Sequence, residues 1–467
     1  MKVLLIRPRV VEYLSSQSAE SFEGAIGLVP PLGLAYLAAS LERESHKVAI
    51  MDCQALGLGP QEIRKEILKE SPQVVGISAM TTNIRGALES ARIAKECKAI
   101  TVIGGPHMMI FPKETLSYEF IDYGIGGEGE YVLNELLLAI EKKGGVSDIK
   151  GLIYRENERI IVNEPAIVDD LDQLPIPAYH LLPLERYEMV NTGNKLVSLI
   201  TIRGCPYKCG FCYRSPISRI IRKRDPLKVV DEIEYFYEKY GIKEINFVNE
   251  SITLGREHLK RICQEILKRN LKINWQSPAR VDQVTEELLR LMKESGCQVL
   301  RFGVESGNQN ILDIIDKRTT LSQIETAFSL CNKIGIETVA YFIIGYLGET
   351  EETIKETIAL ARKISPTYAT FFPATPMPQT SLFAFSVQAG LVEGDYWRDF
   401  TLGKRNDSLP FLFPGAGEWV VKAYRSLYFR PSYILKSLKK INSWKNLKKY
   451  SLAAWALLKM KFKRRKR

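Results

Sequence analysis

The stretch RGCPYKCGFCYRS, residues 203–215, holds Cys205, Cys209 and Cys212 in the spacing C-x3-C-x2-C. A disulfide joins cysteines in pairs and a structural zinc site takes four ligands, so the triplet by itself completes neither. Three thiolates on one loop can hold three irons of a four-iron cluster and leave the fourth iron open. An open metal position is typical of a catalytic centre. A zinc site completed by a remote Cys or His stays open as the alternative interpretation.

The segments around the triplet predict a β/α barrel over residues 196–385. Short runs rich in β-branched residues alternate there with amphipathic helical segments such as DPLKVVDEIEYFYEKY. We expect strands at 196–203, 244–249, 271–276, 298–304, 337–344 and 368–373. Right-handed units in this number curl into a partial TIM-type (β/α)6 barrel, whose chemistry lies at the carboxyl ends of the strands. The triplet directly follows the first strand, so we expect it at the catalytic rim.

Residues 1–150 predict a separate α/β domain of the flavodoxin-like or Rossmann-like kind. Candidate strands alternate with helical patterns, which indicates a parallel sheet with crossover helices. They lie at 2–7, 47–52, 74–78, 100–105 and 122–127. Small residues gather where the later strands end, which is where ligands bind in such sheets. Glycine lets the backbone approach a large, flat cofactor, although tight turns explain the same residues. A hairpin and a linker, 151–195, lead to the barrel.

The composition is that of a soluble globular protein, because 45% of the 467 residues are hydrophobic and 25% are charged. We find no signal peptide and no run of about 20 apolar residues, so we expect a cytoplasmic protein. The net charge of +11 comes from the carboxyl-terminal part, since residues 419–467 hold 16 Lys and Arg and no Asp or Glu. We expect residues 386–467 to form a helical basic extension.

The end of this extension, residues 437–467, mixes Trp and Leu with Lys and finishes in a purely basic run. Such a segment fits peripheral adsorption to an anionic membrane, here the inner membrane face, because clustered basic residues attract acidic lipids. Nucleic acid is the less favoured alternative, since the same residues neutralise phosphates. A solvated terminus with no specific partner is the third interpretation.

The segment CPYKCGFC closely resembles the cluster loop of the radical S-adenosylmethionine (SAM) enzymes, and the resemblance extends across the barrel. In that family the three cysteines, here Cys205, Cys209 and Cys212, bind a 4Fe-4S cluster whose open iron takes the amino and carboxylate groups of SAM. An electron from the cluster cleaves the sulfonium bond and yields a 5′-deoxyadenosyl radical, which removes a hydrogen atom from an unactivated carbon. The family's Pro-Gly-Thr ending appears here with Gln379 in place of the glycine.

The same resemblance implies contacts with SAM. Phe211 would pack near the adenine, Asn249 and Glu250 would meet the ammonium, Arg280 would pair with the carboxylate, and Glu305 and Ser306 would contact the ribose or carboxylate. The structural alternatives are a helix cap for Glu305 and a surface ion pair for Arg280.

The segments PPLGLAYLAASLERESHKV, VVGISAMTT, VIGGPHMMIFP and YGIGGEGE resemble the cobalamin-binding domain that precedes many such barrels. The resemblance implies that the nucleotide tail and the corrin edge are lined by Ser78, Thr81, Gly104, Gly105, Gly127 and Glu128. The Asp-x-His-x-x-Gly motif of classical cobalamin domains is absent, because the loop at 8–30 contains no histidine. His107 is the one histidine expected at this edge, and we interpret it as a pocket-lining residue beside a cobalt that lacks a protein histidine ligand.

Together the two resemblances imply a cobalamin-dependent radical SAM enzyme with a 4Fe-4S cluster, SAM and cobalamin as cofactors. The expected reaction is methylation of an unactivated carbon, in which one SAM methylates the cobalamin and a second supplies the radical. We expect a small-molecule substrate, hydrophobic or lipid-like because relatives of similar architecture act on lipids, hopanoids and tetrapyrroles, and a flavodoxin or ferredoxin as reductant. A cyclase or oxidoreductase that uses cobalamin without methyl transfer is one alternative, and a non-catalytic cobalamin or redox sensor is the other.

Overall fold

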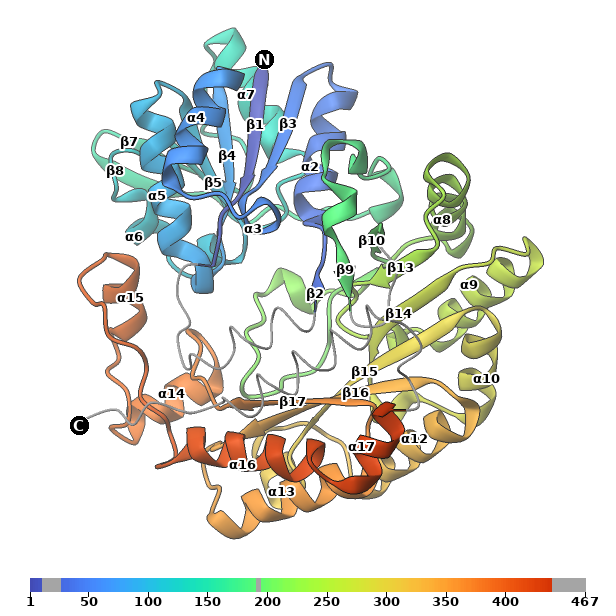
Figure 1. Ribbon diagram of the computed structural model, residues 1–467. Helices are drawn as coiled ribbons and strands as arrows, with labels where there is room; N and C mark the ends of the chain where they lie inside the picture. Colours follow the sequence, from blue (N-terminus) through green and yellow to red (C-terminus); the bar gives the residue numbers. More distant parts are fainter. Residues whose placement is uncertain (11–26, 190–194, 439–467) are drawn as a thin grey trace.

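A computed structural model describes residues 1–10, 27–189 and 195–438 of the chain (Figure 1). Two α/β domains follow one another, each built on a sheet of its own. The basic end of the chain, residues 439–467, lies outside the described residues, so the predicted membrane contact is not placed. In the part that the structure describes, we find no helix with both the length and the apolar character needed to span a bilayer.

The first domain is a seven-stranded sheet in the order β3-β1-β4-β5-β6-β7-β8. Its strands are β1 (Lys2–Arg7), β3 (Lys47–Asp52), β4 (Val74–Ser78), β5 (Ile100–Gly104), β6 (Tyr123–Ile125), β7 (Leu152–Glu156) and β8 (Arg159–Val162). Its helices are α2 (Leu32–Arg43), α3 (Cys53–Leu56), α4 (Pro60–Glu70), α5 (Ile84–Glu96), α6 (Pro112–Leu116) and α7 (Val132–Lys142). The first five strands of the order are parallel, and β1, β4 and β5 in its middle are almost fully buried, which explains their nearly continuous apolar sequences. The predicted hairpin, β7 with β8, pairs with β6 and extends this sheet.

The second domain is a parallel six-stranded sheet in the order β10-β13-β14-β15-β16-β17, which is also the order along the chain. Its strands are β10 (Leu196–Leu199), β13 (Glu244–Phe247), β14 (Asn274–Ala279), β15 (Cys297–Glu305), β16 (Glu337–Ile344) and β17 (Tyr368–Pro373). The crossover helices are α8 (Pro226–Tyr240), α9 (Arg256–Lys268), α10 (Glu286–Glu294), α11 (Gln309–Ile314), α12 (Leu321–Ile334) and α13 (Glu351–Ile364). This confirms the partial (β/α)6 barrel.

The first predicted barrel strand, 196–203, is divided in the structure. β10 ends at Leu199, and β11 (Ile202–Arg203) pairs antiparallel with β12 (Arg222–Lys223). The cysteine loop, residues 204–212, therefore leaves from a small hairpin at the rim of the barrel.

The third barrel strand begins at Asn274, later than the predicted 271–276. The Leu271 N–H donates to the Ile266 carbonyl oxygen at 3.1 Å, so Leu271 closes the end of α9. An apolar residue in a closing turn looks like a strand residue in sequence.

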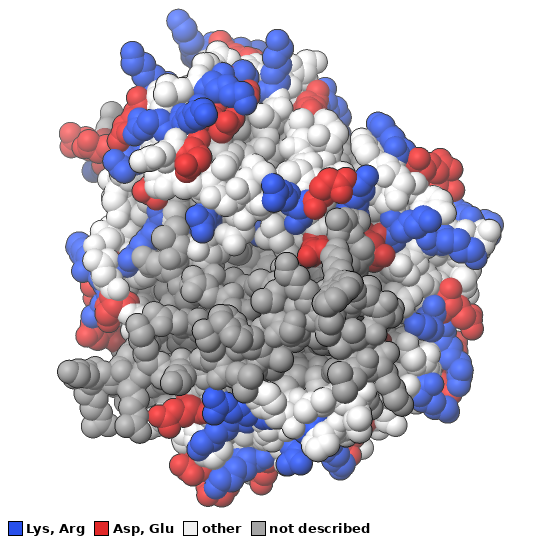
Figure 2. All heavy atoms as spheres, in the orientation of Figure 1, with Lys and Arg blue, Asp and Glu red and all other residues white. Residues whose placement is uncertain are grey.

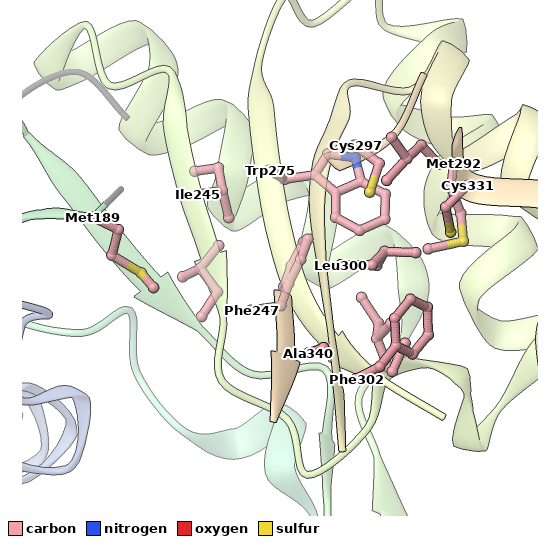
Figure 3. Close-up of a cluster of buried hydrophobic side chains, with 14 of the residues drawn as sticks. Met189, Ile245, Phe247, Trp275, Met292, Cys297, Leu300, Phe302, Cys331 and Ala340 are labelled. Atoms are coloured by element: carbon pink, nitrogen blue, oxygen red, sulfur yellow. The ribbon is translucent and has the colours of Figure 1, made fainter. Parts of the chain in front are cut away.

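The core of the barrel lies between the sheet and its helices (Figure 3). Trp275 meets Phe247 edge-on with ring centroids 5.6 Å apart, and its indole N–H donates to the Ser295 carbonyl oxygen at 3.1 Å. Buried free thiols outside the triplet are Cys53, Cys263, Cys297 and Cys331. Such burial is typical of reduced cysteines in a protein core.

The carboxyl-terminal part is helical in the described residues, with α14 (Ser381–Gln388), α15 (Tyr396–Thr401), α16 (Ala416–Tyr428) and α17 (Pro431–Leu438). The Tyr424 and Tyr428 hydroxyls of α16 bond to the backbone of β17. By contrast, α15 reaches the first domain, where the Tyr118 hydroxyl donates to the Thr401 carbonyl oxygen at 3.0 Å. These helices therefore connect the two domains.

The domains share a buried apolar cluster, which we call the shared cluster. It joins the carboxyl edge of the first sheet to the rim of the barrel, and its members include Ile77, Ala79, Met108, Ile315, Tyr346 and Leu382. A second link is β2 (Gly27–Leu28) paired with β9 (Glu188–Met189). The carboxyl ends of the first sheet thus face the barrel rim (Figure 1).

The face of the molecule drawn in Figure 2 carries mixed charge in its described part. Lys and Arg alternate with Asp and Glu around the described part of the face drawn in Figure 2, and neither sign forms a continuous area there. Such a surface is typical of a folded domain that stays dispersed in water.

Candidate functional site

The cysteine loop is held at its entry and at its middle. Gly204 has a φ of +98°, and a Cβ there would lie 2.1 Å from the Ile220 carbonyl oxygen, so only glycine fits. The Gly210 N–H donates to the Ile315 carbonyl oxygen, and the Gly210 carbonyl accepts from the Leu382 N–H, both at 2.8 Å. Contacts with distant parts of the barrel therefore fix where the thiols stand.

The three thiols of the loop are free, with Cys205 buried and Cys209 and Cys212 half-buried. Burial raises the pKa of the Cys209 thiol, and the charges of Lys317 and Arg280 oppose that rise. Among the described residues, no three His, Cys, Asp or Glu side chains converge where one metal ion could sit. In a four-iron cluster each thiolate binds a different iron, and the three thiols of this one loop are the candidates for such ligands.

Arg280 lies beside the cysteine loop at the end of β14. Its guanidinium carbon stacks 3.6 Å from the ring centroid of Tyr207, a residue of the loop. Its Nε donates to Asp282 at 2.9 Å, and a terminal nitrogen donates to the Lys317 carbonyl oxygen at 2.9 Å. The side chain is buried at 8% exposure, so the structure makes it part of the rim and not a surface ion pair.

Glu305 and Phe211 meet at Lys317. The Lys317 ammonium donates to the Glu305 carboxylate at 2.6 Å and lies 5.9 Å from the Phe211 ring centroid. Glu305 has a φ of +66°, a strained conformation for a residue with a Cβ and one that is common at functional sites. The Ser306 hydroxyl is fully buried, 3.2 Å from that of Thr357. The structure thus brings Glu305 to the Lys317 side chain, which lies beside Phe211 of the cysteine loop, and it places Ser306 against α13.

Asn249 and Glu250 hold the segments on either side of the cysteine loop. The Asn249 Oδ1 accepts from the N–H groups of Thr201 and Ile202 at 2.8 and 3.3 Å, and its Nδ2 donates to the Thr201 hydroxyl at 2.9 Å. Glu250 pairs with Arg214, beyond the loop, at 3.4 Å. Both residues lie at the expected rim, and their contact with SAM stays a prediction.

Several small residues that were predicted to meet cobalamin lie at the carboxyl edge of the first sheet. Ser78 and Gly104 are paired at the ends of β4 and β5. Gly105 has a φ of +109°, and a Cβ there would lie 2.6 Å from the Ala79 carbonyl oxygen. Gly127 has a φ of +96°, and a Cβ there would lie 2.3 Å from a backbone carbonyl oxygen. The tight-turn interpretation therefore accounts for Gly105 and Gly127, whereas Gly104 has room for a side chain.

His107 is fully buried in the turn after β5. Its Nδ1 lies 3.1 Å from the Thr81 hydroxyl, and its ring contacts Phe111 at 5.5 Å. Its Nε2 is buried and has no hydrogen-bond partner in the described ranges. Burial lowers the pKa of the imidazole to about 3, so the ring is neutral at neutral pH. A neutral ring with one unused nitrogen fits the predicted lining role.

Glu128 connects the two domains. Its carboxylate accepts two hydrogen bonds from Arg222, at 2.6 and 2.8 Å, and pairs with Arg203 at 3.1 Å. Arg203 also pairs with Glu130 at 2.6 Å. Burial alone would raise the pKa of Glu128, but the bonds from Arg222 and the charge of Arg203 lower it. This network ties the first sheet to the hairpin that carries the cysteine loop, and a cobalamin contact of Glu128 stays a prediction.

Tyr346 and Glu349 belong to the rim but were not singled out from the sequence. The Tyr346 hydroxyl lies 2.6 Å from where a Cβ on Gly210 would be, directly against the cysteine loop. Glu349 is buried at 7% exposure and accepts from the N–H groups of Gly345 and Tyr346. The sequence signal that could have identified Glu349 is the segment GYLGET, residues 345–350, because an acidic side chain can accept hydrogen bonds from the backbone of a glycine-containing turn just before it.

Gln379 takes the conformation expected of the glycine that it replaces. Its φ is +58°, and Thr380, which follows, caps α14 through its hydroxyl. Leu382, in the first turn of α14, donates to the cysteine loop. The turn therefore keeps its contact with the loop without glycine.

Two protein-family models match the chain, one over each half of this site. Residues 199–361 match the radical SAM superfamily, and residues 25–137 match the B12 binding domain. The cysteine loop lies in the first range, and the edge that carries His107 lies in the second.

Similar proteins match over nearly the whole chain. It is 35% identical to an uncharacterized methyltransferase of Pyrococcus horikoshii, over 94% of this chain and 95% of that protein. It is 31% identical to an anaerobic magnesium-protoporphyrin IX monomethyl ester cyclase of Rubrivivax gelatinosus, over 93% of this chain and 78% of that protein. The structure of the cobalamin-dependent SAM radical enzyme OxsB, with aqua-cobalamin and SAM bound, shares the fold at a TM-score of 0.74 and 21% identity, over 98% of this chain and 71% of that one.

Proposed function

Because this chain belongs to the radical SAM superfamily and carries a B12-binding domain, we propose that it is a cobalamin-dependent methyltransferase. The proposed reaction moves a methyl group from SAM to an unactivated carbon of a small molecule. One observation carries the proposal. The cysteine loop presents three free thiols after the first barrel strand, and Cys209 and Phe211 pack on the shared cluster that also contains the edge of the first sheet.

The residues fit the cofactors in their chemistry. Cys205, Cys209 and Cys212 would hold the 4Fe-4S cluster, which supplies the electron that opens the sulfonium of SAM, while cobalamin supplies a methyl carrier. Arg280 and Lys317 place positive charge beside the loop, which favours thiolates and the carboxylate of SAM. The proposed SAM contacts are Phe211, Asn249, Glu250, Arg280, Glu305 and Ser306, and the proposed cobalamin contacts are Ser78, Thr81, Gly104, Gly105, His107, Gly127 and Glu128.

Apolar side chains of both domains pack against the cysteine loop. Tyr346 and Leu382 on the barrel side and Met108 on the side of the first domain are almost fully buried in the shared cluster. A carbon radical is quenched by side reactions unless the site is closed. Apolar packing from both domains around the loop supports radical chemistry there.

The direct test is anaerobic reconstitution with iron, sulfide and cobalamin, followed by incubation with SAM and reduced flavodoxin or ferredoxin. We expect the natural protein to hold iron and labile sulfide and to release 5′-deoxyadenosine, and Cys212→Ala to do neither. Cys97→Ser is the matched control, because Cys97 is a half-buried thiol outside the triplet. Zinc without labile sulfide in the natural protein would overturn the proposal. A loaded cluster that never cleaves SAM would favour the sensor.

A cyclase is the second candidate, because the cyclase from Rubrivivax gelatinosus matches 93% of this chain. Product mass separates the two reactions. Methyl transfer adds one CH2 unit to the substrate, whereas ring closure or oxidation removes hydrogens.

We also propose a peripheral contact with an anionic membrane, which would suit a lipid-like substrate. Ile434 and Leu435 of α17 are 42% and 61% exposed. The sequence from 436 to 467 adds 13 Lys and Arg and no acid. Apolar side chains beside clustered positive charge favour adsorption to acidic lipids. We expect co-sedimentation with phosphatidylglycerol vesicles that high salt abolishes, and none with phosphatidylcholine. Equal binding to both vesicles would contradict the electrostatic part of this proposal.

A further inference from the structure

Four Arg and Lys side chains are buried in the described ranges, and one of them lacks an acidic partner. The paired ones are Arg224 with Glu232, Arg280 with Asp282, and Lys317 with Glu305. The fourth, Arg301 on β15, is buried at 8% exposure, and all its hydrogen bonds in the described residues go to neutral acceptors. A buried charge is costly unless it is paired, so a missing counter-ion suggests that a ligand provides one.

Arg301 lies on the inner face of the barrel sheet. Leu300 and Phe302, its neighbours in sequence, belong to the core between the sheet and the helices (Figure 3), and successive strand residues point to opposite faces. The register places Arg301 beside Val339 of β16. Arg301 also precedes Glu305 by four residues on the same strand, so it lies about 13 Å below the catalytic rim.

Two hydrogen-bond donors at this place are unused. A terminal nitrogen of Arg301 donates to the Gln276 Oε1 at 2.9 Å, and the other donates to the Asn246 Oδ1 at 2.9 Å, while we find no bond from Arg301 Nε within the described chain. The Gln276 Nε2 is buried and also has no partner there. The bond from Arg301 fixes the orientation of the Gln276 amide, because the reversed amide would set two donors against each other. A ligand that brings acceptor oxygens to this place would satisfy these donors.

Aromatic side chains line the same face next to Arg301. Tyr341 of β16 and Phe372 of β17 stack with ring centroids 6.4 Å apart, and Phe372 is 42% exposed. The strand register puts Tyr341 beside Gly303 of β15, two residues beyond Arg301 and therefore on its face. The inner face thus combines a positive polar side with an accessible aromatic side.

We propose that Arg301 and Gln276 bind an anionic group of the substrate, a carboxylate or a phosphate, while Tyr341 and Phe372 contact the apolar part of the same molecule. A guanidinium binds such oxyanions through parallel N–H donors, and a water-poor site strengthens the pair. This inference rests on the proposed function and names its substrate class as an amphiphilic anion. The anion binds deep in the barrel, so that the apolar part extends toward the cysteine loop.

The experiment uses full-length protein and three fluorescent probes in equilibrium dialysis, namely 2-naphthoate, 2-naphthyl phosphate and uncharged 2-naphthamide. We expect one or both anions to bind the natural protein at least about tenfold more tightly than the amide. The tighter anion identifies carboxylate or phosphate as the natural group. This readout needs neither cluster nor turnover, so it stands apart from the test of methyl transfer.

The variants locate the site. Arg301→Gln should weaken anion binding by about tenfold or more and leave the amide unchanged, and Arg301→Lys should retain part of the affinity. Arg269→Gln, which removes an arginine from an ion-pair cluster at the end of α9, is the matched control and should bind like the natural protein. Anions that bind the natural protein no better than the amide would overturn the inference without needing any variant to fold. Unchanged anion binding in a folded Arg301→Gln would overturn it as well.

Discussion

Glu349 should make the stability of the barrel rim depend on pH. Its carboxylate caps the turn at Gly345 and Tyr346, and its second oxygen is buried without a partner in the described ranges. Burial raises its pKa from 4.5 to about 7, against the lowering effect of the two backbone bonds. Because the pKa is higher in the folded state, the native protein keeps a proton that the unfolded chain has lost. This stabilisation is complete below pH 4.5 and is lost as the pH rises through about 7.

The size of the effect follows from the shift. The pKa of Glu349 rises from 4.5 to about 7, and each pKa unit corresponds to about 1.4 kcal/mol, so the change in the free energy of unfolding is about 3 kcal/mol. Glu349→Gln mimics the protonated acid, since an amide oxygen can accept the same two N–H groups. The stability of the natural protein relative to this variant should therefore fall by about 3 kcal/mol between about pH 4 and about pH 8.

Urea unfolding of both proteins over that pH range, followed by circular dichroism, measures the difference. Titrations elsewhere in the chain occur in both proteins and cancel in the comparison. Tyr346→Phe keeps the carboxyl group and should retain the natural pH profile. A stability difference between the natural protein and Glu349→Gln that stays constant with pH, or grows in favour of the natural protein as the pH rises, would refute the reasoning.

Three further predictions follow from the contacts around the cysteine loop. Gly210→Ala places a methyl group 2.6 Å from the Tyr346 hydroxyl, so it should lower the free energy of unfolding by about 1–3 kcal/mol and also lower the iron content of the reconstituted protein. Adding Tyr346→Phe should restore the iron content, and no recovery in this double variant would contradict the contact. Arg222→Met leaves the Glu128 carboxylate without its main partner and should lower the free energy of unfolding, measured by thermal unfolding, by about 3 kcal/mol. The loss caused by Arg222→Met should be smaller in a protein that already carries Glu128→Gln, and additive losses would count against a direct pair. Removing iron with a chelator should lower the melting temperature of the loaded natural protein and leave that of Cys212→Ala unchanged; equal shifts would place the iron elsewhere.

Much of the fold could be predicted because its signals are local. A strand inside a parallel sheet has a short, largely apolar sequence, and β1, β3, β4, β16 and β17 lie where such runs predict them. Strand ends were less certain where an apolar residue closes a helix, as at Leu271. The division between β10 and β11 also depends on a distant residue, since the Asn249 side chain binds the backbone at Thr201.

The candidate site likewise combines residues that a local sequence pattern identified with residues that only the fold brought together. Cys205, Cys209 and Cys212 are close in sequence, so their spacing, together with their place after the first barrel strand, predicted a cluster loop. The side chains that surround the loop come from segments far along the chain, and neither Tyr346 nor Glu349 carries a strong local pattern. No local pattern indicated that Arg222, a residue of the other domain, binds the Glu128 carboxylate.

The order of residues along the chain was sufficient for the periodicity that forms two parallel sheets and for three thiols on one short loop. Which charges are paired became visible only after the chain had folded, because an ion pair forms when distant residues meet and water leaves. Arg301 illustrates this physical reason: in the sequence it is one of many basic residues, and in the folded barrel it is the buried cation for which the described residues provide no counter-ion.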